Sequence, residues 1–395
     1  MATEGRSEAA PARAFYNDPK LRGIFYQIVL LAIVLWLGAE FVINARDNLR
    51  AARIATGLGF LDKTAGFSIN QTLIPYTESD TYGRVFVVGL LNTLLVAVIG
   101  IVLATVLGFL VGIARLSSNW LLQRIAGAYV ESIRNLPLLF QILFWYLAVL
   151  GALPSPRQSI SIFGEVFINN RGLFIPRPIF DAGSEQVAAA FVVGILLSIG
   201  VRIWARRRQE ATGRQFPVLW TAVALVIAST GLAVIATGFP ISFDRPALRG
   251  FNFAGGGRVI PEFVALLVAL TTYTAAFIAE IVRAGILAVS HGQTEAAYSL
   301  GLRPGQTLRL VVIPQALRVI IPPLTSQYLN LTKNSSLAVA IGYPDLFAVF
   351  AGTALNQTGQ AIEIIGITMA VYLLISLVTS LLMNWYNARI RLVER

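Results

Sequence analysis

Long runs of apolar residues recur along this chain of 395 residues. Several approach or exceed ~20 residues, the length that a helix needs to cross the hydrocarbon core of a bilayer. Because lipid offers no partners for backbone groups, a spanning segment must be a helix or part of a closed barrel. The runs are continuously apolar instead of alternating, which favours helices. With only 13% charged residues, the chain is predicted to be an all-α polytopic membrane protein.

About eight spans are predicted from these runs. They cover residues 24–43, 85–114, 187–203, 217–239, 261–289, 317–343 and 362–386, and the third lies within residues 120–153, after an amphipathic start. The third is expected to break at Pro137, because proline removes a backbone donor and clashes with the preceding turn. The seventh is expected to kink near its start, at Pro322 and Pro323. Glycines spaced along the second span favour ordinary close helix packing.

The distribution of positive charge predicts the orientation of these spans. An even number of spans places both termini on one side, where about 19 lysines and arginines lie, against about 11 on the other. The positive-inside rule therefore puts both termini, and a polar segment at residues 290–316, in the cytoplasm. In a soluble protein the net charge of +11 would suggest nucleic-acid binding. Here the arginines lie in short loops between spans, so no nucleic-acid partner is expected.

The sequence offers little for catalysis or for a cofactor. It has no cysteine and one histidine, His291, which excludes disulfides and thiolate metal sites. The triplet Gly255-Gly256-Gly257 lacks the lysine and Ser/Thr of a phosphate loop, and predicts a flexible turn. No nucleophile–base constellation is present in the sequence pattern. We expect a protein that is not an enzyme and that binds no metal or cofactor itself.

Two pairs of opposite charges are spaced three residues apart, so each can pair on one helix face. Glu280 and Arg283 lie near the end of the sixth predicted span, and Glu131 and Arg134 lie just before Pro137. Charges within spans are functional candidates, because burying them is costly. The favoured interpretation is a pair of structural salt bridges that brace the cytoplasmic side. The alternative is contact with a substrate.

A polar cluster interrupts the seventh predicted span. It consists of Lys333 with Asn330, Thr332, Asn334 and Ser335. These side chains could line a translocation path, where the lysine would meet a substrate carboxylate. They could equally hold neighbouring helices together through hydrogen bonds. The sequence leaves both interpretations open.

The polar segment at residues 290–316 predicts two short helices at a sharp angle on the membrane surface. Thr294 can cap a helix that begins at Glu295, and Gly301 suits its C-terminus, where a positive φ is often required. Pro304 then suits the start of a second helix, which is expected to run to a break before Pro314. Such a surface either docks a partner or is an amphipathic loop without one.

The same segment resembles the EAA loop of ABC importer permeases. The matching residues are Glu295-Ala296-Ala297, Gly301 and Val311-x-Ile313-Pro314, with Val311 and Ile313 where the family usually has Ile and Leu. The resemblance implies that this loop is a coupling helix seated in a cleft of the ATP-binding subunit. The residues that it assigns to docking are Gln293, Glu295, Ala296, Ala297, Gly301 and Pro314.

Further motifs are similar to those of the polar amino-acid uptake subgroup, the histidine, glutamine and arginine type. They are Phe277 (where a tyrosine is expected), Ala279-Glu280, Arg283, Gly285-Ile286, Gly292-Gln293, Pro314-Gln315-Ala316, Lys333-x-Ser335-Ser336-Leu337, Glu131-x-x-Arg134 and Pro137-Leu138-Leu139. The similarity covers about 83–153 and 261–390, or five spans. The enlarged layout resembles the permeases of general L-amino-acid importers of Gram-negative bacteria.

This resemblance predicts a division of the chain into four parts. They are 1–84 with a tail, an extra span and a periplasmic loop; 85–153, the first part of the permease core; 154–260, an insertion with two extra spans; and 261–395, the second part of the core with the coupling loop 290–316. The partners implied are an ATPase subunit that binds the ATP, a second permease subunit and a periplasmic binding protein that delivers amino acids at the inner membrane. The alternative is an ion-coupled secondary transporter, although no internal repeat of that class is evident.

Overall fold

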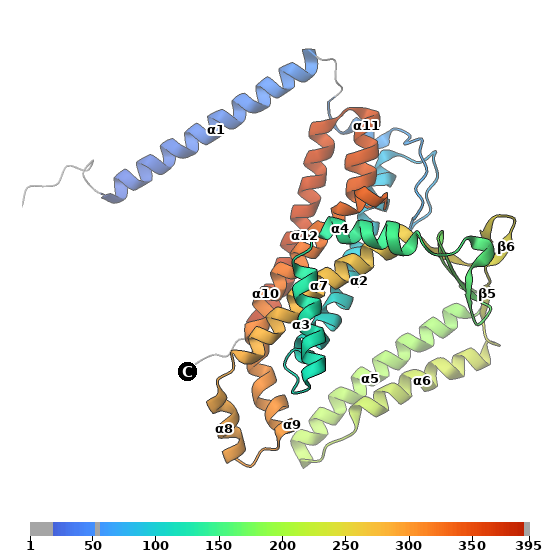
Figure 1. Ribbon diagram of the computed structural model, residues 1–395, viewed down its shortest axis with the longest axis vertical. Helices are drawn as coiled ribbons and strands as arrows, with labels where there is room; N and C mark the ends of the chain where they lie inside the picture. Colours follow the sequence, from blue (N-terminus) through green and yellow to red (C-terminus); the bar gives the residue numbers. More distant parts are fainter. Residues whose placement is uncertain (1–18, 52–55, 391–395) are drawn as a thin grey trace, which may run out of the picture.

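The structure, a computed structural model, describes residues 19–51 and 56–390. Figure 1 shows long helices gathered in a bundle, with a helical hairpin and small β-sheets to one side. The helices are α1 (Pro19–Ala51), α2 (Tyr82–Ala114), α3 (Trp120–Arg134), α4 (Leu138–Leu143), α5 (Ser184–Thr212), α6 (Val218–Ala236), α7 (Pro261–Leu287), α8 (His291–Ser299), α9 (Pro304–Thr307), α10 (Ile313–Asn334), α11 (Leu355–Thr358) and α12 (Ala361–Ile390). Short 3₁₀ or π turns are η2 (Leu58–Asp62), η3 (Phe144–Leu150), η4 (Pro156–Gln158), η5 (Leu308–Val312), η6 (Ser335–Ile341) and η7 (Phe347–Ala354). The predicted all-α membrane fold is confirmed in its main part.

Within the described residues, seven helices are long and apolar enough to cross a membrane, or eight if one bent pair counts as a span. That pair is α3 followed by α4 and η3, bent by 107°. The break falls at Pro137, where it was predicted. Gln141 stabilises the bend, because its side-chain amide donates to the carbonyl oxygens of Ile133 (3.0 Å) and Leu136 (3.1 Å) at the end of α3. The segment predicted to hold the third span is therefore two helices at a steep angle, divided at the predicted break.

The seventh predicted span differs more from expectation. The helix is continuous from Pro304 to Ile341, so the predicted break before Pro314 is wrong. The π turn η5 ends at Val312, two residues before Pro314. Its i→i+5 spacing shifts the hydrogen-bond pattern of the helix at the point where proline has no N–H to donate. Pro322 and Pro323 lie inside α10, which runs through them. The coupling segment is thus joined to this span without an interruption.

The core of the bundle depends on close contact between α2 and α7. A Cβ atom added at Gly108 would lie 2.6 Å from the Cβ of Ile278, and one at Gly112 would lie 2.8 Å from the carbonyl oxygen of Ala279. Only glycine permits two backbones to approach this closely. The predicted packing role of these glycines is confirmed. Helices α10 and α12 complete the bundle around this pair, as Figure 1 shows.

One end of the bundle is closed by residues 56–81, which belong to the loop predicted after the first span. Phe60 of η2 packs on Tyr82 and on Phe350 of η7, with ring centroids 6.3 and 6.0 Å apart. Gly57 donates its backbone N–H to the carboxylate of Glu363, at 2.7 Å. This segment therefore forms a second apolar core with η7 and α12.

The insertion at residues 154–260 contains strands that sequence analysis missed. They are β1 (Ile160–Ile162), β2 (Val166–Asn169), β3 (Gly172–Ile175), β4 (Arg177–Phe180), β5 (Ile241–Asp244), β6 (Ala247–Arg249), β7 (Asn252–Ala254) and β8 (Gly257–Val259). Antiparallel pairing gives a sheet of order β1-β2-β3-β8 and two ribbons, β4-β5 and β6-β7. The predicted flexible turn holds only in part: Gly255 and Gly256 have φ values of 76° and 67°, but Gly257 begins β8.

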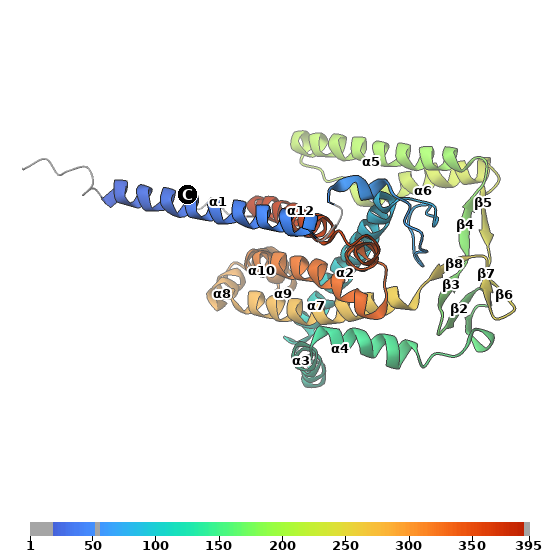
Figure 2. The same cartoon turned by 90° about the horizontal axis from the view of Figure 1, so that it is seen from above.

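Figure 2 shows how the insertion is placed: the sheets form one end of the molecule and lead to the paired helices α5 and α6. These two helices pack on each other, and both views show them apart from the main bundle. Only Gly194 and Ala205 are buried on α5, and no residue of α6 is buried. The two extra spans predicted here are therefore present as an exposed helical hairpin.

The α2–α7 contact gives a first prediction. Replacing Gly108 with alanine forces a Cβ against Ile278, and overpacking of this kind costs about 1–3 kcal/mol. Gly366→Ala on α12 is the matched control, because a Cβ there meets nothing within 4 Å. We expect thermal unfolding of the purified protein to shift downward for Gly108→Ala alone. Equal melting temperatures for the two variants would contradict close packing at Gly108.

Candidate functional site

The coupling segment forms a helical hairpin at one end of the molecule (Figure 1). Its first helix, α8, ends as predicted at Gly301, which has a φ of 77°. The N–H of Leu302 donates to the carbonyl of Ala297 (3.1 Å), and that of Gly301 donates to Tyr298 (2.9 Å). This is the Schellman arrangement, which satisfies the last carbonyls of a helix.

The start of α8 was predicted wrongly. The helix begins at His291 with Ser290 before it, so Thr294 lies inside the helix and does not cap it. The first turn closes four residues earlier than expected, because the N–H of Gln293 donates to the carbonyl of Ser290 at 3.0 Å. Glu295 is therefore in the second turn of α8.

The second arm of the hairpin is the extended base of a span. Pro304 occupies the first turn of α9, as predicted, and Gln306 accepts a hydrogen bond from the N–H of Arg303 at 3.0 Å. The helix then continues through η5 into α10. The side chains of Gln315 and Gln293 are hydrogen-bonded at 3.2 Å, which ties α8 to α10. This hydrogen bond links α8 to the base of that span.

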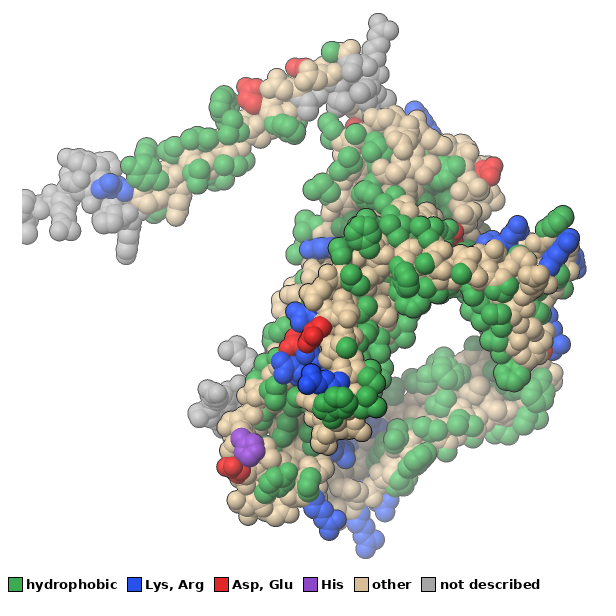
Figure 3. Space-filling model, viewed as in Figure 1, with side chains coloured by type: hydrophobic (Ala, Val, Ile, Leu, Met, Phe, Trp, Pro, Cys, Tyr) green, Lys and Arg blue, Asp and Glu red, His purple; other side chains and the backbone are tan. Residues whose placement is uncertain are grey.

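The residues assigned to docking do not all face outward. Glu295 is exposed, and its carboxylate lies 3.0 Å from Nδ1 of the exposed His291; Figure 3 shows this sole histidine in purple beside an acidic group. Ala296 is exposed, whereas Ala297 is only 3% exposed and packs inward. Ala297 therefore supports the hairpin from inside. Gln293 and Gly301 are exposed and Pro314 is half-buried.

The hairpin also presents apolar side chains that were not predicted. Leu300 is 83% exposed at the tip, and Tyr298, Leu308 and Leu310 are exposed nearby. Exposed apolar groups set among polar ones are typical of a surface that a partner covers. The sequence signal was present, since Leu300 precedes the glycine at the turn, but its exposure depends on how the hairpin folds.

A charged network centred on Glu280 joins three helices. One carboxylate oxygen accepts Nη2 (2.9 Å) and Nε (3.2 Å) of Arg283 on α7, so the predicted pair is present. The other accepts Nη1 of Arg115, the C-cap residue directly after α2. Arg134 of α3 places its Nη1 at 4.0 Å from the same oxygen. Figure 3 shows acidic and basic side chains gathered in one patch at the middle of this face.

The predicted pair of Glu131 with Arg134 is wrong. Arg134 turns instead to Glu280 and lies 5.0 Å from the ring centroid of Phe277, a cation–π contact. Among the described residues Glu131 forms no ion pair; it lines a polar cavity of about 580 Å³ with Arg115, Gln123, Arg124, Gly127, Ala128 and Arg283. Helical spacing permitted the pairing of Glu131 with Arg134. Helix α7 instead offers Arg134 two partners at once, the carboxylate of Glu280 and the ring of Phe277.

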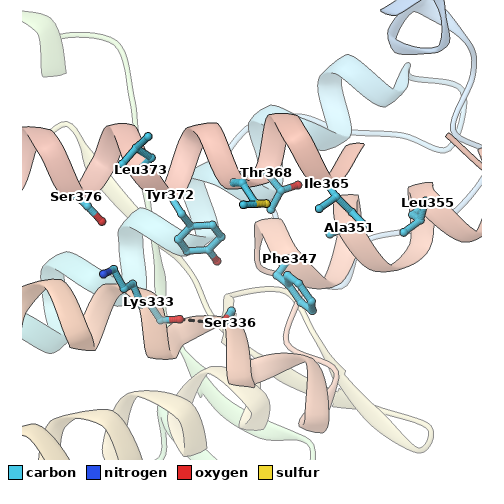
Figure 4. A pocket seen from close by; sticks show the side chains of 11 residues that line it. Lys333, Ser336, Phe347, Ala351, Leu355, Ile365, Thr368, Tyr372, Leu373 and Ser376 are labelled. Atoms are coloured by element: carbon cyan, nitrogen blue, oxygen red, sulfur yellow. Dashed lines mark hydrogen bonds between the residues drawn. The ribbon is translucent and has the colours of Figure 1, made fainter. Parts of the chain in front are cut away.

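Lys333 lines a cavity of about 620 Å³ between α10, η7 and α12, shown in Figure 4. Lys333 and Ser336 face Tyr372 and Ser376 of α12 across this space. The rest of the lining is mainly apolar: Phe347, Ala351, Leu355, Ile365, Thr368, Met369 and Leu373. A single cation in a mainly apolar cavity is suited to a small ligand that carries a negative group.

The structure divides the predicted polar cluster around Lys333. Ser335 is buried and donates its hydroxyl to the carbonyl of Thr332 at 2.8 Å, which supports the helix-packing interpretation for that residue. Asn330 is exposed and Asn334 half-buried, and neither lines the cavity. The side chains that face Lys333 across the cavity, Tyr372 and Ser376, belong to α12. The residues next to Lys333 in the sequence therefore could not predict them.

An acid that sequence analysis missed fixes one wall of this cavity. Asp345 is fully buried, and its Oδ1 accepts the N–H of Ala348 at 2.8 Å, in the first turn of η7. Its Oδ2 accepts the hydroxyl of Tyr372 at 3.2 Å. Asp345 therefore joins η7 to α12 and orients Tyr372 beside the cavity.

These features define a polytopic helical membrane protein with an exposed hairpin at one end and a cavity between two spans. Residues 100–392 match the family described as "Binding-protein-dependent transport system inner membrane component". The chain belongs to this family of membrane components of binding-protein-dependent transport systems.

Several curated relatives match over almost their whole length. The general L-amino acid transport system permease protein AapQ of Rhizobium johnstonii is 54% identical over 383 residues, covering 97% of this chain and 96% of the relative. The putative amino-acid ABC transporter permease protein YhdX of Escherichia coli strain K12 is 54% identical, covering 99% of each. The glutamate/glutamine/aspartate/asparagine transport system permease protein BztB of Rhodobacter capsulatus is 45% identical, covering 96% of each. The resemblance to ABC permeases of the enlarged general amino-acid group is confirmed.

The Glu280 network gives a second prediction. Glu280→Gln removes the charge that offsets three arginines, and loss of hydrogen bonds to a charged group costs about 1.5–3 kcal/mol. Glu210→Gln is the matched control, because Glu210 makes a single, exposed pair with Arg206 at 3.2 Å and such pairs contribute little. We expect the thermal unfolding temperature of the purified protein to fall for Glu280→Gln only. If both variants unfold like the wild type, the network does not stabilise the bundle.

Proposed function

We propose that this chain is the permease subunit of an ABC importer that carries L-amino acids across the inner membrane, with both termini in the cytoplasm. The observation that carries the proposal is the exposed hairpin with its EAA pattern, Glu295 and Ala296 outward and Leu300 at the tip. The names of the relatives at 54% identity support amino acids as the substrates. The excess of positive charge on the same side as the hairpin supports the orientation.

The partners follow from what the chain lacks and what it exposes. Its sequence contains no phosphate loop, so ATP would be bound and hydrolysed by a separate ATPase subunit that receives the hairpin. A pathway through the membrane would form with a second permease subunit, either a related chain or a second copy. A periplasmic binding protein would deliver the amino acid on the opposite side. The chain itself would then be no enzyme and would need no cofactor of its own.

The geometry suggests how the ATPase would drive transport. Closure of the ATPase pair would move α8, and the Gln293–Gln315 hydrogen bond would help to pass this movement to α10. Helix α8 also follows α7 closely, and the Glu280 network holds α7 together with α2 and α3. Both arms of the hairpin are therefore attached to spans. Alternating access would result when these spans tilt together and expose the path to one side and then the other.

The cavity beside Lys333 would be the part of the path that this chain supplies. The ammonium group of Lys333, an exposed side chain at the edge of the cavity, would meet the carboxylate of an amino acid. Because Lys333 is on α10, the span that η5 joins to the hairpin, movement of the hairpin would alter the cavity. The side chain of Ser376 offers a hydrogen-bond partner for the polar groups of a substrate.

An ion-coupled secondary transporter is the alternative, and membership of a binding-protein-dependent family speaks against it. Uptake by an ABC importer should stop with vanadate, an inhibitor of the ATPase, and should persist when an uncoupler collapses the proton gradient at constant ATP. The opposite pattern would favour the alternative.

The docking proposal gives a third prediction. Glu295→Arg or Leu300→Asp should lower ATP-driven uptake of labelled amino acids by about tenfold or more, as loss of one interface anchor does. The amount of permease in the membrane should remain normal, since both side chains are exposed. Glu78→Arg, a charge reversal in the exposed loop before α2, serves as the control. Normal uptake in both hairpin variants would rule out docking at this surface.

The path proposal gives a fourth prediction. Lys333→Met should lower uptake about tenfold or more, because a charge-assisted hydrogen bond to the substrate is lost. Lys333→Arg, which keeps the charge, should retain more activity. Asn330→Ala is the control, since Asn330 is near in sequence but outside the cavity. Uptake in proteoliposomes measures the effect, and equal activity of Lys333→Met and Asn330→Ala would contradict a role for the cavity.

A further inference from the structure

The hairpin of α5 and α6 contains a groove that neither transport nor ATPase docking explains. The groove has a volume of about 650 Å³, and all but two of its lining residues are apolar: Ile195, Ser198, Ile199, Arg202, Val218, Leu219, Ala222, Val223, Val226 and Ile227. The hydroxyl of Ser198 is already used, because it donates to the carbonyls of Gly194 (2.7 Å) and Ala222 (3.2 Å). Arg202 is therefore the one polar group in the lining that remains available to a ligand.

Arg202 lies at the mouth of the groove, beside the first residue of α6. Two contacts show that Arg202 of α5 lies beside the start of α6. Ser198, one turn before Arg202, is hydrogen-bonded to Ala222 of α6, and Trp204, two residues after Arg202, packs on Phe216 with ring centroids 5.4 Å apart. Trp204 and Trp220 are both exposed near this level. Exposed tryptophans are typical of the boundary between lipid and water, and this pattern predicts that Arg202 lies at the depth of the lipid headgroups.

The length of the groove agrees with one leaflet of a bilayer. From Val218 to Ile227 the helix α6 rises about 14 Å at 1.5 Å per residue. Half of the ~30 Å hydrocarbon core is about 15 Å. A chain that enters at Arg202 can therefore lie along the groove as far as the middle of the membrane.

The charge at the mouth favours an anionic occupant. The segment around the turn carries Arg202, Arg206, Arg207, Arg208 and Arg214 against the single acid Glu210. Glu210 pairs with Arg206 at 3.2 Å, and Arg208 lies over the ring of Trp204 at 5.3 Å. Among the described side chains, no carboxylate pairs with Arg202, Arg207 or Arg214. The mouth of the groove thus presents unneutralised guanidinium groups.

We propose that this groove binds an anionic phospholipid, with an acyl chain along α6 and the phosphate at Arg202. A basic pocket between spans at the level of the headgroups is the arrangement that recognises anionic lipids. Guanidinium binds phosphate oxygens through two parallel hydrogen bonds. The proposal concerns the insertion and does not depend on the transported substrate.

Lipid binding to the full-length chain, purified with its partner subunits, tests the proposal by native mass spectrometry. The probes are phosphatidylglycerol and phosphatidylcholine with identical acyl chains. We expect tighter binding of phosphatidylglycerol, and about a fivefold loss of that preference in Arg202→Gln, as removal of one basic residue near the surface predicts. Arg202→Lys should keep most of the preference. Arg206→Gln is the matched control, because Glu210 already neutralises that charge, and it should lose less than twofold.

A second pair of variants tests the groove itself. Val223 lines the groove, and Val223→Trp should fill it and reduce binding of both lipids. Val192→Trp, on an exposed part of α5 outside the groove, should bind lipid like the wild type. Equal affinity for the two headgroups, or equal losses in Arg202→Gln and Arg206→Gln, would overturn the proposal.

A protein occupant is the competing outcome, and it can be detected directly. The chain has no native cysteine, so Val223→Cys provides one unique thiol. After the thiol is labelled with a benzophenone maleimide in detergent, the proposal expects illumination of the assembled complex in lipid to give cross-links to lipid and none to a partner chain. Efficient cross-linking to a second permease subunit would show that protein covers the groove, and would overturn the proposal.

Discussion

The close contact between α2 and α7 is the interaction on which the rest of the molecule depends. Within a bilayer the hydrophobic effect does not favour contact between helices, because lipid tails are as apolar as the side chains. Helix association therefore relies on dense packing between small residues. Gly108 and Gly112 let the two backbones approach until their partners on α7 leave no space for a Cβ. The Glu280 network lies near the end of this same contact, where Arg115 is the C-cap residue of α2. Helix α8 follows α7 within a few residues, so the position of the hairpin is set by packing within the bundle.

Sequence patterns correctly predicted the features that depend on residues close together in the chain. The apolar runs gave the spans, Pro137 gave the break between α3 and α4, and Gly301 gave the end of α8, because each acts within one or two turns of itself. Thr294 failed as a cap because Ser290 closes the first turn earlier. The continuous helix at Pro314 was missed because a π turn can absorb a proline that would otherwise end a helix.

Contacts between helices could not be predicted in the same way. Arg134 had an acid three residues away, yet it turns to Glu280, which is far away in the sequence. Tyr372 and Asp345 complete the surroundings of Lys333 from another helix and a short turn. The strands of the insertion are three or four residues long, too short for alternation to be distinguished from a polar loop. In each of these cases the missing information was which segments meet in space.

The hydrogen bond between Gly57 and Glu363 has a consequence for the order of biosynthesis. It joins residues 306 positions apart, at the end of the bundle that residues 56–81 cover. At ribosomal rates of about 5–20 residues per second, Glu363 is made roughly 15–60 s after Gly57. The segment at residues 56–81 therefore leaves the ribosome long before the residue that binds Gly57 has been made. The apolar core at that end of the protein can form only after α12 has been synthesised. A chain truncated before α12 would therefore expose the apolar side chains of residues 56–81 to the proteases and chaperones that recognise unfolded proteins.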